Sequence, residues 1–188
     1  DELKAEAVYC PVFEGNKMEP DFAVFDKNTG GSLARVLSTG DYKEGQTTVA
    51  YLNGSVKRAI LDWYGKRRYE AESVRRAIGR VVNKANELGL KELTLVYPKV
   101  LPVSQAEEPT IAMVEAALLA NYKMMEYMTT LDERQKSRLK RLNILVANRA
   151  VAQKTEQGAL RGQVAADATI LTRDLANYPS NYLNPTRY

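Results

Sequence analysis

"KRAILDWYGKRRYEAESVRRAIGRVVNKANELGLKELTLVY", residues 57–97, contains a β-rich run, an amphipathic stretch and a second β-rich run in succession. In the middle stretch, 69–88, apolar residues recur at three- and four-residue spacing, which places them on one face of a helix. They are Val74, Ile78, Val81, Val82, Ala85 and Leu88. The flanking runs, 57–65 and 92–97, predict strands. A succession of strand, helix and strand is typical of a crossover unit, so we expect part of the sheet to be parallel.

Two more β-rich runs precede this unit. Residues 47–52 (TTVAYL) lead into 57–65 through Asn53-Gly54, the strongest hairpin-type turn signal in the chain. These two strands should therefore be antiparallel. Residues 5–13 (AEAVYCPVF) predict another strand, and the proline within it favours a position near an edge of the sheet.

The remaining elements follow from turn signals and from periodicity. They are a Gly- and Pro-marked loop at 14–21, a short helix within 28–41, a Pro-bounded loop at 98–109, a helix at 110–128, a charged connector at 131–141, a buried strand at 142–147 and a helix at 148–176. The last helix would be on the order of 40 Å long, more than a domain of this size needs, which suggests a strut that leads out of it. Gly158 and Gly162 should bend this helix or delay its start.

These elements predict an α/β fold, with a mixed β-sheet flanked by helices and a long C-terminal exit helix. We expect one domain over 1–150 and a linker helix with its connector over 151–188.

Composition excludes several kinds of active site. The 188 residues include a single cysteine, Cys10, and no histidine. A structural zinc site, a Ser-His-Asp triad and a Cys-His pair therefore cannot be assembled from this chain. No apolar run reaches the roughly 18 residues that indicate a membrane span, and no secretory signal is apparent, so we expect a cytoplasmic protein with no membrane partner.

The stretch "TRDLANYPSNYLNPTRY", residues 172–188, is unusually apolar and strongly punctuated by Asn and Pro. Its pattern resembles the linker of the leucyl aminopeptidase family, the dinuclear-metal cytosolic aminopeptidases. The matching residues are Arg173, Asp174, Leu175, Asn177, Pro179, Asn181, Leu183 and Pro185. Three further blocks resemble that family's N-terminal domain in the same order: "PVFEG", "TGGSLARVLSTGDYKEGQTT" and "RRAIGRVVNKANELGLKELTL". One departure is "AILDWYGK", where Trp63 and Tyr64 replace smaller residues of the family pattern.

The resemblance implies a macro-domain-like accessory domain that carries no catalytic, cofactor-binding or metal-binding residues of its own. Its partners would be a C-terminal catalytic domain of the same protein and, in a hexamer, further copies of it. The catalytic domain would hold two divalent metals, Zn or Mn, and would release N-terminal amino acids, leucine preferred, through a metal-activated water. The family's metal-site motifs do not occur here. The accessory domain would serve assembly and regulation.

Two other functions remain open from the residues alone. Basic residues gather at Lys57-Arg58, Lys66-Arg67-Arg68, Arg75-Arg76 and 136–141, which would suit a DNA-binding module. Thr29-Gly30-Gly31 precedes a helix and could present backbone N–H groups to the phosphates of ADP-ribose or a nucleotide. The simpler explanations are a solvated charged face and glycines required by backbone conformation.

Several side chains have structural explanations that we favour. Asp62 and Asp174 show no spacing typical of a catalytic carboxylate pair, and we expect structural roles for both. Arg173 and Asp174 should bridge to neighbouring elements. A set of Met and Tyr residues at helical spacing should belong to the core: Met113, Tyr122, Met124, Met125, Tyr127 and Met128.

Overall fold

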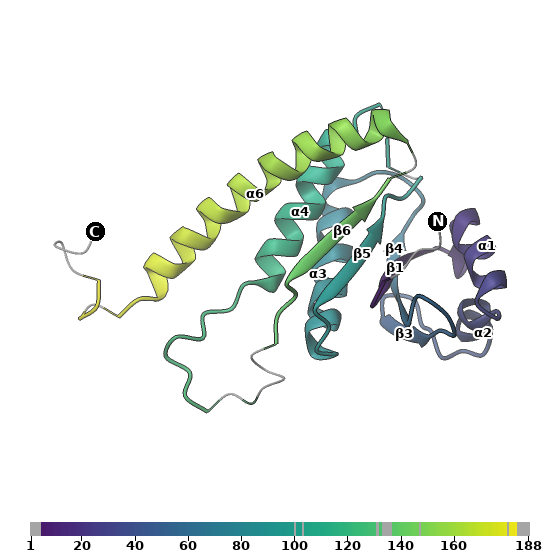
Figure 1. Ribbon diagram of the computed structural model, residues 1–188, viewed down its shortest axis with the longest axis horizontal. Helices are drawn as coiled ribbons and strands as arrows, with labels where there is room; N and C mark the ends of the chain where they lie inside the picture. Colours follow the sequence, from purple (N-terminus) through teal and green to yellow (C-terminus); the bar gives the residue numbers. More distant parts are fainter. Residues whose placement is uncertain are drawn as a thin grey trace.

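The computed structural model describes residues 5–99, 101–102, 104–130, 132, 137–146, 148–179 and 181–183 (Figure 1). Within these residues a mixed sheet is flanked by helices. The strands are β1 (Val8–Phe13), β2 (Lys17–Met18), β3 (Thr47–Tyr51), β4 (Arg58–Gly65), β5 (Glu92–Val96) and β6 (Arg141–Leu145). The helices are α1 (Pro20–Asn28), α2 (Ser32–Ser38), α3 (Ala71–Glu87), α4 (Glu107–Asn121) and α6 (Arg149–Asn177). The predicted α/β class and the long C-terminal helix are confirmed.

The sheet has the strand order β3-β4-β1-β5-β6, and β2 pairs with β1 outside this path. Strands β4, β1, β5 and β6 are parallel, whereas β3 runs antiparallel to β4 in a register from Thr47↔Asp62 to Tyr51↔Arg58. The predicted hairpin and the predicted crossover are therefore both present. The crossover from β4 through α3 to β5 passes over one strand, because β1 lies between its two ends.

The prediction that the first strand lies near an edge is wrong, because β1 is in the middle of the sheet. Its proline is tolerated because β5 pairs only with Val8 and Tyr9. Pro11 lies beyond the end of that ladder, where a missing N–H costs little. All six residues of β1 are buried, as a central strand requires.

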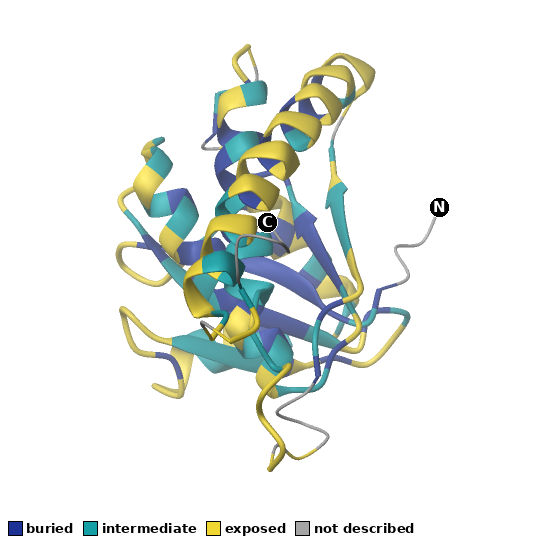
Figure 2. Ribbon diagram, turned by 90° about the vertical axis from the view of Figure 1, so that its left-hand side faces the viewer, coloured by how far each residue is buried: buried dark blue, intermediate teal, exposed yellow. Residues whose placement is uncertain are grey.

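Each face of the sheet has its own core. Alternate side chains of the strands point to opposite faces. One face packs against α3 and α4, with Tyr9, Ile60 and Leu93 among its buried residues. The other packs against α1 and α2, with Cys10 and Leu61 among its buried residues. Figure 2 shows the central strands as the most deeply buried part of the molecule.

Three further predictions about elements need correction. The loop predicted at 14–21 contains β2 and the start of α1, whose Pro20 occupies the first turn, where a missing N–H costs nothing. The helix predicted at 110–128 begins at Glu107 and ends at Asn121, because Tyr122 is already extended. The strand predicted as buried at 142–147 is the half-exposed edge strand β6; Ala147 lies outside the described residues.

The early end of α4 also overturns the predicted core role of its Met and Tyr residues. Only Met113 lies in the core, at 1% exposure. Tyr127 and Met128 follow the helix in an exposed loop, and Tyr122, Met124 and Met125 are half-buried there.

Candidate functional site

The long helix α6 is held against α4 by a seam of small residues. Its buried residues recur at three- and four-residue spacing, which places them on one face. They are Val151, Thr155, Gly158, Gly162 and Ala166. In Figure 1 α6 lies along α4 over this stretch and then runs on beyond its end.

The two glycines of the seam allow the backbones of α4 and α6 to approach closely. A Cβ atom on Gly158 would lie 2.5 Å from the carbonyl oxygen of Glu107, and one on Gly162 would lie 2.9 Å from that of Ile111. Both distances are below 3.0 Å, closer than a Cβ atom approaches another heavy atom in real proteins. The expectation that these glycines delay the start of α6 is therefore wrong: α6 is one helix of 29 residues from Arg149, and the glycines fit it against α4. A bend at the glycines stays a prediction.

Asn148 fixes the start of this helix. Its side-chain oxygen accepts a hydrogen bond from the backbone N–H of Val151 at 3.0 Å, which caps the first turn.

Arg173 and Asp174 join the far part of α6 to Tyr122, the residue directly after α4. The hydroxyl of Tyr122 donates a hydrogen bond to Asp174 Oδ1 at 2.5 Å, and this carboxylate raises the pKa of Tyr122. The guanidinium of Arg173 lies 5.9 Å from the centre of the Tyr122 ring and donates a long hydrogen bond, 3.5 Å, to the carbonyl of Leu119. Both side chains thus bridge to a neighbouring element, as predicted.

Aromatic rings hold the connector that follows α6. Tyr178 stacks on Tyr182, with ring centres 4.9 Å apart, and meets Tyr127 edge-on at 6.4 Å. The backbone turns there, because the N–H groups of Tyr182 and Leu183 both bond to the carbonyl of Pro179. The loop after α4 and the connector therefore contact each other.

The other residues of the predicted connector lie on or just after the end of α6. Leu175 and Leu183 are half-buried, whereas Asn177, Pro179 and Asn181 are exposed. Pro185 lies outside the described residues. Their role between two domains stays a prediction.

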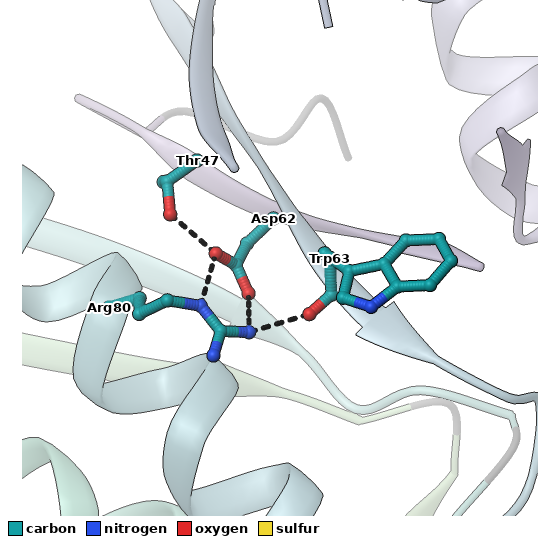
Figure 3. Close-up of polar contacts among 4 residues, drawn as sticks. All are labelled: Thr47, Asp62, Trp63 and Arg80. Carbon is teal, nitrogen blue, oxygen red and sulfur yellow. Dashed lines mark hydrogen bonds and ion pairs between the residues drawn. The ribbon is translucent and has the colours of Figure 1, made fainter. Parts of the chain in front are cut away.

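An ion pair joins the buried Asp62 on β4 to Arg80 on α3, whose side chain is 38% exposed, next to the strand β3 (Figure 3). The Asp62 carboxylate on β4 is fully buried and accepts bonds from Arg80 Nε at 2.9 Å, from Arg80 Nη2 at 2.7 Å and from the hydroxyl of Thr47 at 2.5 Å. Arg80 also donates to the carbonyl of Trp63 at 2.6 Å. Burial raises the pKa of Asp62, and these hydrogen bonds oppose that shift. Because Arg80 and Thr47 occupy both oxygens, the group links β3, β4 and α3.

Trp63 and Tyr64, the bulky residues at which the chain departs from the family pattern, have separate roles. Trp63 contributes its carbonyl to this network. Tyr64 is buried and packs edge-on against Phe13 at 5.5 Å. Core packing therefore accommodates the larger Tyr64, whereas Trp63 is half-buried and belongs to neither core.

In Thr29-Gly30-Gly31, the N–H groups of Thr29 and Gly31 already bond to carbonyl groups of α1. Gly30 and Gly31 have φ values of 87° and 72°, a conformation that favours glycine. The buried carboxylate of Asp26 accepts bonds from the N–H groups of Leu33 at 2.6 Å and Ala34 at 2.9 Å. The position that a phosphate would occupy is thus filled by the chain's own side chain.

Many of the basic residues that suggested DNA binding are paired with carboxylates of the same chain. The pairs are Arg67 with Glu19, Arg68 with Glu70, Arg75 with Glu115 and Arg76 with Glu72. Paired guanidinium groups have less charge to offer to phosphates. This surface therefore gives little support to a nucleic-acid site.

A cavity of about 340 Å³ lies between α1 and the ends of β5 and β6. Phe22, Phe25 and Val96 contribute to its apolar lining. Its charged lining residues, Asp21 and Lys99, pair with each other at 2.8 Å. The cavity therefore has few polar groups left to orient a ligand.

The residues that the structure describes contain no group of three or more His, Cys, Asp or Glu side chains arranged to hold a metal ion. Cys10 is buried, and burial raises the pKa of its thiol well above the ordinary value. Such a thiol is a poor nucleophile. Within the same described part, none of the helices has the combination of length and apolar composition that crossing a membrane requires.

The fold defines an α/β domain with an exit helix, and its sequence places it in a family. Residues 10–130 match the family model described as "Cytosol aminopeptidase family, N-terminal domain". The chain belongs to this family, as the resemblance of its motifs predicted.

Individual relatives agree with this membership. The chain is 25% identical over 194 residues to a probable cytosol aminopeptidase of Sulfurihydrogenibium sp. (strain YO3AOP1), a match that covers 100% of the chain and 38% of the relative. It is 31% identical over 160 residues to a probable cytosol aminopeptidase of Roseiflexus castenholzii (strain DSM 13941 / HLO8), covering 82% of the chain and 32% of the relative. The chain thus spans about a third of the length of such relatives.

Solved structures agree on the fold. A mutant of tomato leucine aminopeptidase is similar with a TM-score of 0.76 at 16% identity, covering 98% of this chain and 38% of that one. The bottromycin maturation enzyme BotP is similar with a TM-score of 0.64 at 22% identity, covering 97% of this chain and 35% of that one.

Proposed function

We propose that this chain is the non-catalytic N-terminal domain of a leucyl aminopeptidase, whose C-terminal domain releases N-terminal amino acids, leucine preferred, from peptides. The observation that carries the proposal is the match of 10–130 to the N-terminal domain of the family, in a chain that spans 38% of the matched relative. The parent protein would be a cytoplasmic hexamer, in which this macro-like domain serves assembly and regulation.

The metal ions belong, in this proposal, to the C-terminal domain. The chain has no histidine, and its described residues provide no cluster of donors that fits a metal ion. Two divalent ions, Zn or Mn, would there activate the water that attacks the peptide. The residues of the present chain take no part in that step.

The proposed role of the present chain is to carry and position the catalytic domain. Residues 1–150 would form the accessory domain, and 151–188 would form the linker helix and connector. The contacts of Tyr122 with Arg173 and Asp174 support this role, because they fix the direction in which α6 leaves the domain. Arg173 to Pro185 would then be the connector between the two domains.

The proposal is tested by measuring hydrolysis of leucine amide by the purified 188-residue chain with added Zn²⁺ or Mn²⁺. We expect no turnover above the buffer rate. The control is the full-length gene product under the same conditions, which should be active. Metal-dependent turnover by the 188-residue chain would contradict the proposal.

A further inference from the structure

Helix α6 has a second apolar face, which the rest of the described chain leaves uncovered. Leu160, Val164 and Leu171 are 62%, 70% and 59% exposed. Their spacing of four and seven residues aligns them in one stripe along the helix. The half-buried Leu175 continues this stripe by one further turn. We call these four residues the outer stripe.

The outer stripe and the glycine seam lie on opposite sides of the helix. At 3.6 residues per turn, the mean direction of the outer stripe is about 170° from that of the seam. Packing against α4 therefore cannot bury both. Figure 2 shows the outward side of α6 as largely exposed along its length. Single exposed apolar residues are ordinary, whereas several large ones aligned on one helix face indicate an interaction surface.

We infer that the outer stripe is the docking surface for the part of the parent protein that follows this chain. The inference rests on the proposed function. Because the chain corresponds to the N-terminal domain of the family and spans 38% of the matched relative, most of such a relative lies beyond it. That part is joined to the end of α6, and consecutive elements of a chain are usually neighbours in space.

The connector supplies a second argument for this occupant. Three more side chains with apolar surface follow Leu175 along the chain. Tyr178 and Leu183 are half-buried, and Tyr182 is exposed. They extend the apolar surface in the direction of the chain. A surface that continues into the linker suits a covalently attached partner. Such a tether gives an effective concentration on the order of millimolar, so a narrow stripe is enough to hold it.

A second copy of this chain is the competing occupant. In an antiparallel pair of α6 helices, Leu160 would face Leu175 and Val164 would face Leu171 of the other copy. The same arrangement would place Arg161 opposite Asp174. In the present structure, however, Arg161 already pairs with Glu107, so the contact between copies would have to compete with an ion pair inside one chain. The tethered part is therefore the occupant that we propose.

Thiol labelling tests this surface without reference to activity. Cys10 is the chain's one cysteine and is buried, so it gives little background. Val164→Cys and Leu171→Cys place a thiol in the outer stripe. Thr172→Cys is the matched control, because Thr172 is exposed in the same turn but points about 100° away from Leu171. Each variant is made in the 188-residue chain and in the full-length gene product, and iodoacetamide labelling is located by peptide mass spectrometry.

We expect Val164→Cys and Leu171→Cys to react at least roughly tenfold more slowly in the full-length protein, with no such change at Thr172→Cys. Equal rates in both proteins would overturn the inference, even if the full-length protein is an active aminopeptidase. Slow labelling in the 188-residue chain that becomes faster on dilution would also overturn it, in favour of a second copy. Hydrogen exchange of the unsubstituted proteins provides a check free of mutations: amides of 160–177 should exchange more slowly in the full-length protein.

Discussion

Replacing Gly158 by alanine should destabilise the domain, although the same change usually strengthens a helix. An alanine in a helix interior is favoured over glycine by about 1 kcal/mol. Here the added Cβ would lie 2.5 Å from the Glu107 carbonyl oxygen and 2.9 Å from the Cβ of Thr110. The first of these atoms is backbone, so α4 or α6 must shift as a whole.

The expected magnitude follows from these opposing effects. Overpacking of a close interface costs about 1–3 kcal/mol, and a clash with backbone belongs at the upper end of that range. After the gain in helix propensity is subtracted, we expect a net loss of about 1–2 kcal/mol in the free energy of unfolding. For a chain of this size each kcal/mol lowers Tm by about 2–4 °C.

Gly79→Ala is the matched control for this substitution. Gly79 lies inside α3, and an added Cβ would meet no atom within 4 Å. Gly79→Ala should therefore raise the free energy of unfolding by about 0.5–1 kcal/mol. The assay is thermal and urea unfolding followed by circular dichroism. The two variants should shift Tm in opposite directions; a Gly158→Ala protein as stable as Gly79→Ala would refute the close packing of α4 and α6.

Three further substitutions test the polar contacts. Arg80→Met leaves the buried Asp62 without its partner; because Arg80 is 38% exposed and solvent screens the pair, the cost should lie below the range for fully buried pairs, at about 2–3 kcal/mol at pH 7 in urea unfolding. Without Arg80 the pKa of Asp62 in the folded state rises further, so the folded state binds a proton more readily than the unfolded state. The loss of unfolding free energy relative to the unsubstituted protein should therefore shrink as pH falls toward 4. A loss independent of pH would argue against a buried carboxylate. Tyr122→Phe removes the hydrogen bond to Asp174 and should speed hydrogen exchange at 171–177 but not at 151–166, whereas unchanged exchange would show that this bond does not hold the helix end. Asp26→Ala removes the cap of α2 and should cost about 1–2 kcal/mol in thermal unfolding, and a loss below about 0.3 kcal/mol would show that the cap is dispensable.

Local patterns in the sequence were sufficient for the elements whose signals are strong. Asn53-Gly54 predicted the hairpin, and the apolar face of 69–88 predicted α3, because turn chemistry and periodicity act over a few residues. The family resemblance was carried by motifs in order along the chain and did not depend on three-dimensional contacts.

Features that depend on contacts between distant residues were not predictable in this way. Pro11 suggested an edge strand, but the short ladder of β5 leaves room for it in the middle of the sheet. Gly158 and Gly162 suggested a weak helix, because their use is visible only once α4 lies beside them. The ion pair of Asp62 with Arg80 joins residues 18 positions apart on different elements, and no local pattern marks it.

The central claim is that this chain is the N-terminal, non-catalytic part of an aminopeptidase. The most direct test compares the full-length gene product with the 188-residue chain for release of N-terminal leucine from a peptide, with and without a metal chelator. We predict that the full-length protein is active, that the chelator abolishes its activity, and that the 188-residue chain is inactive under all conditions. A full-length protein without metal-dependent aminopeptidase activity, or an active 188-residue chain, would contradict the claim.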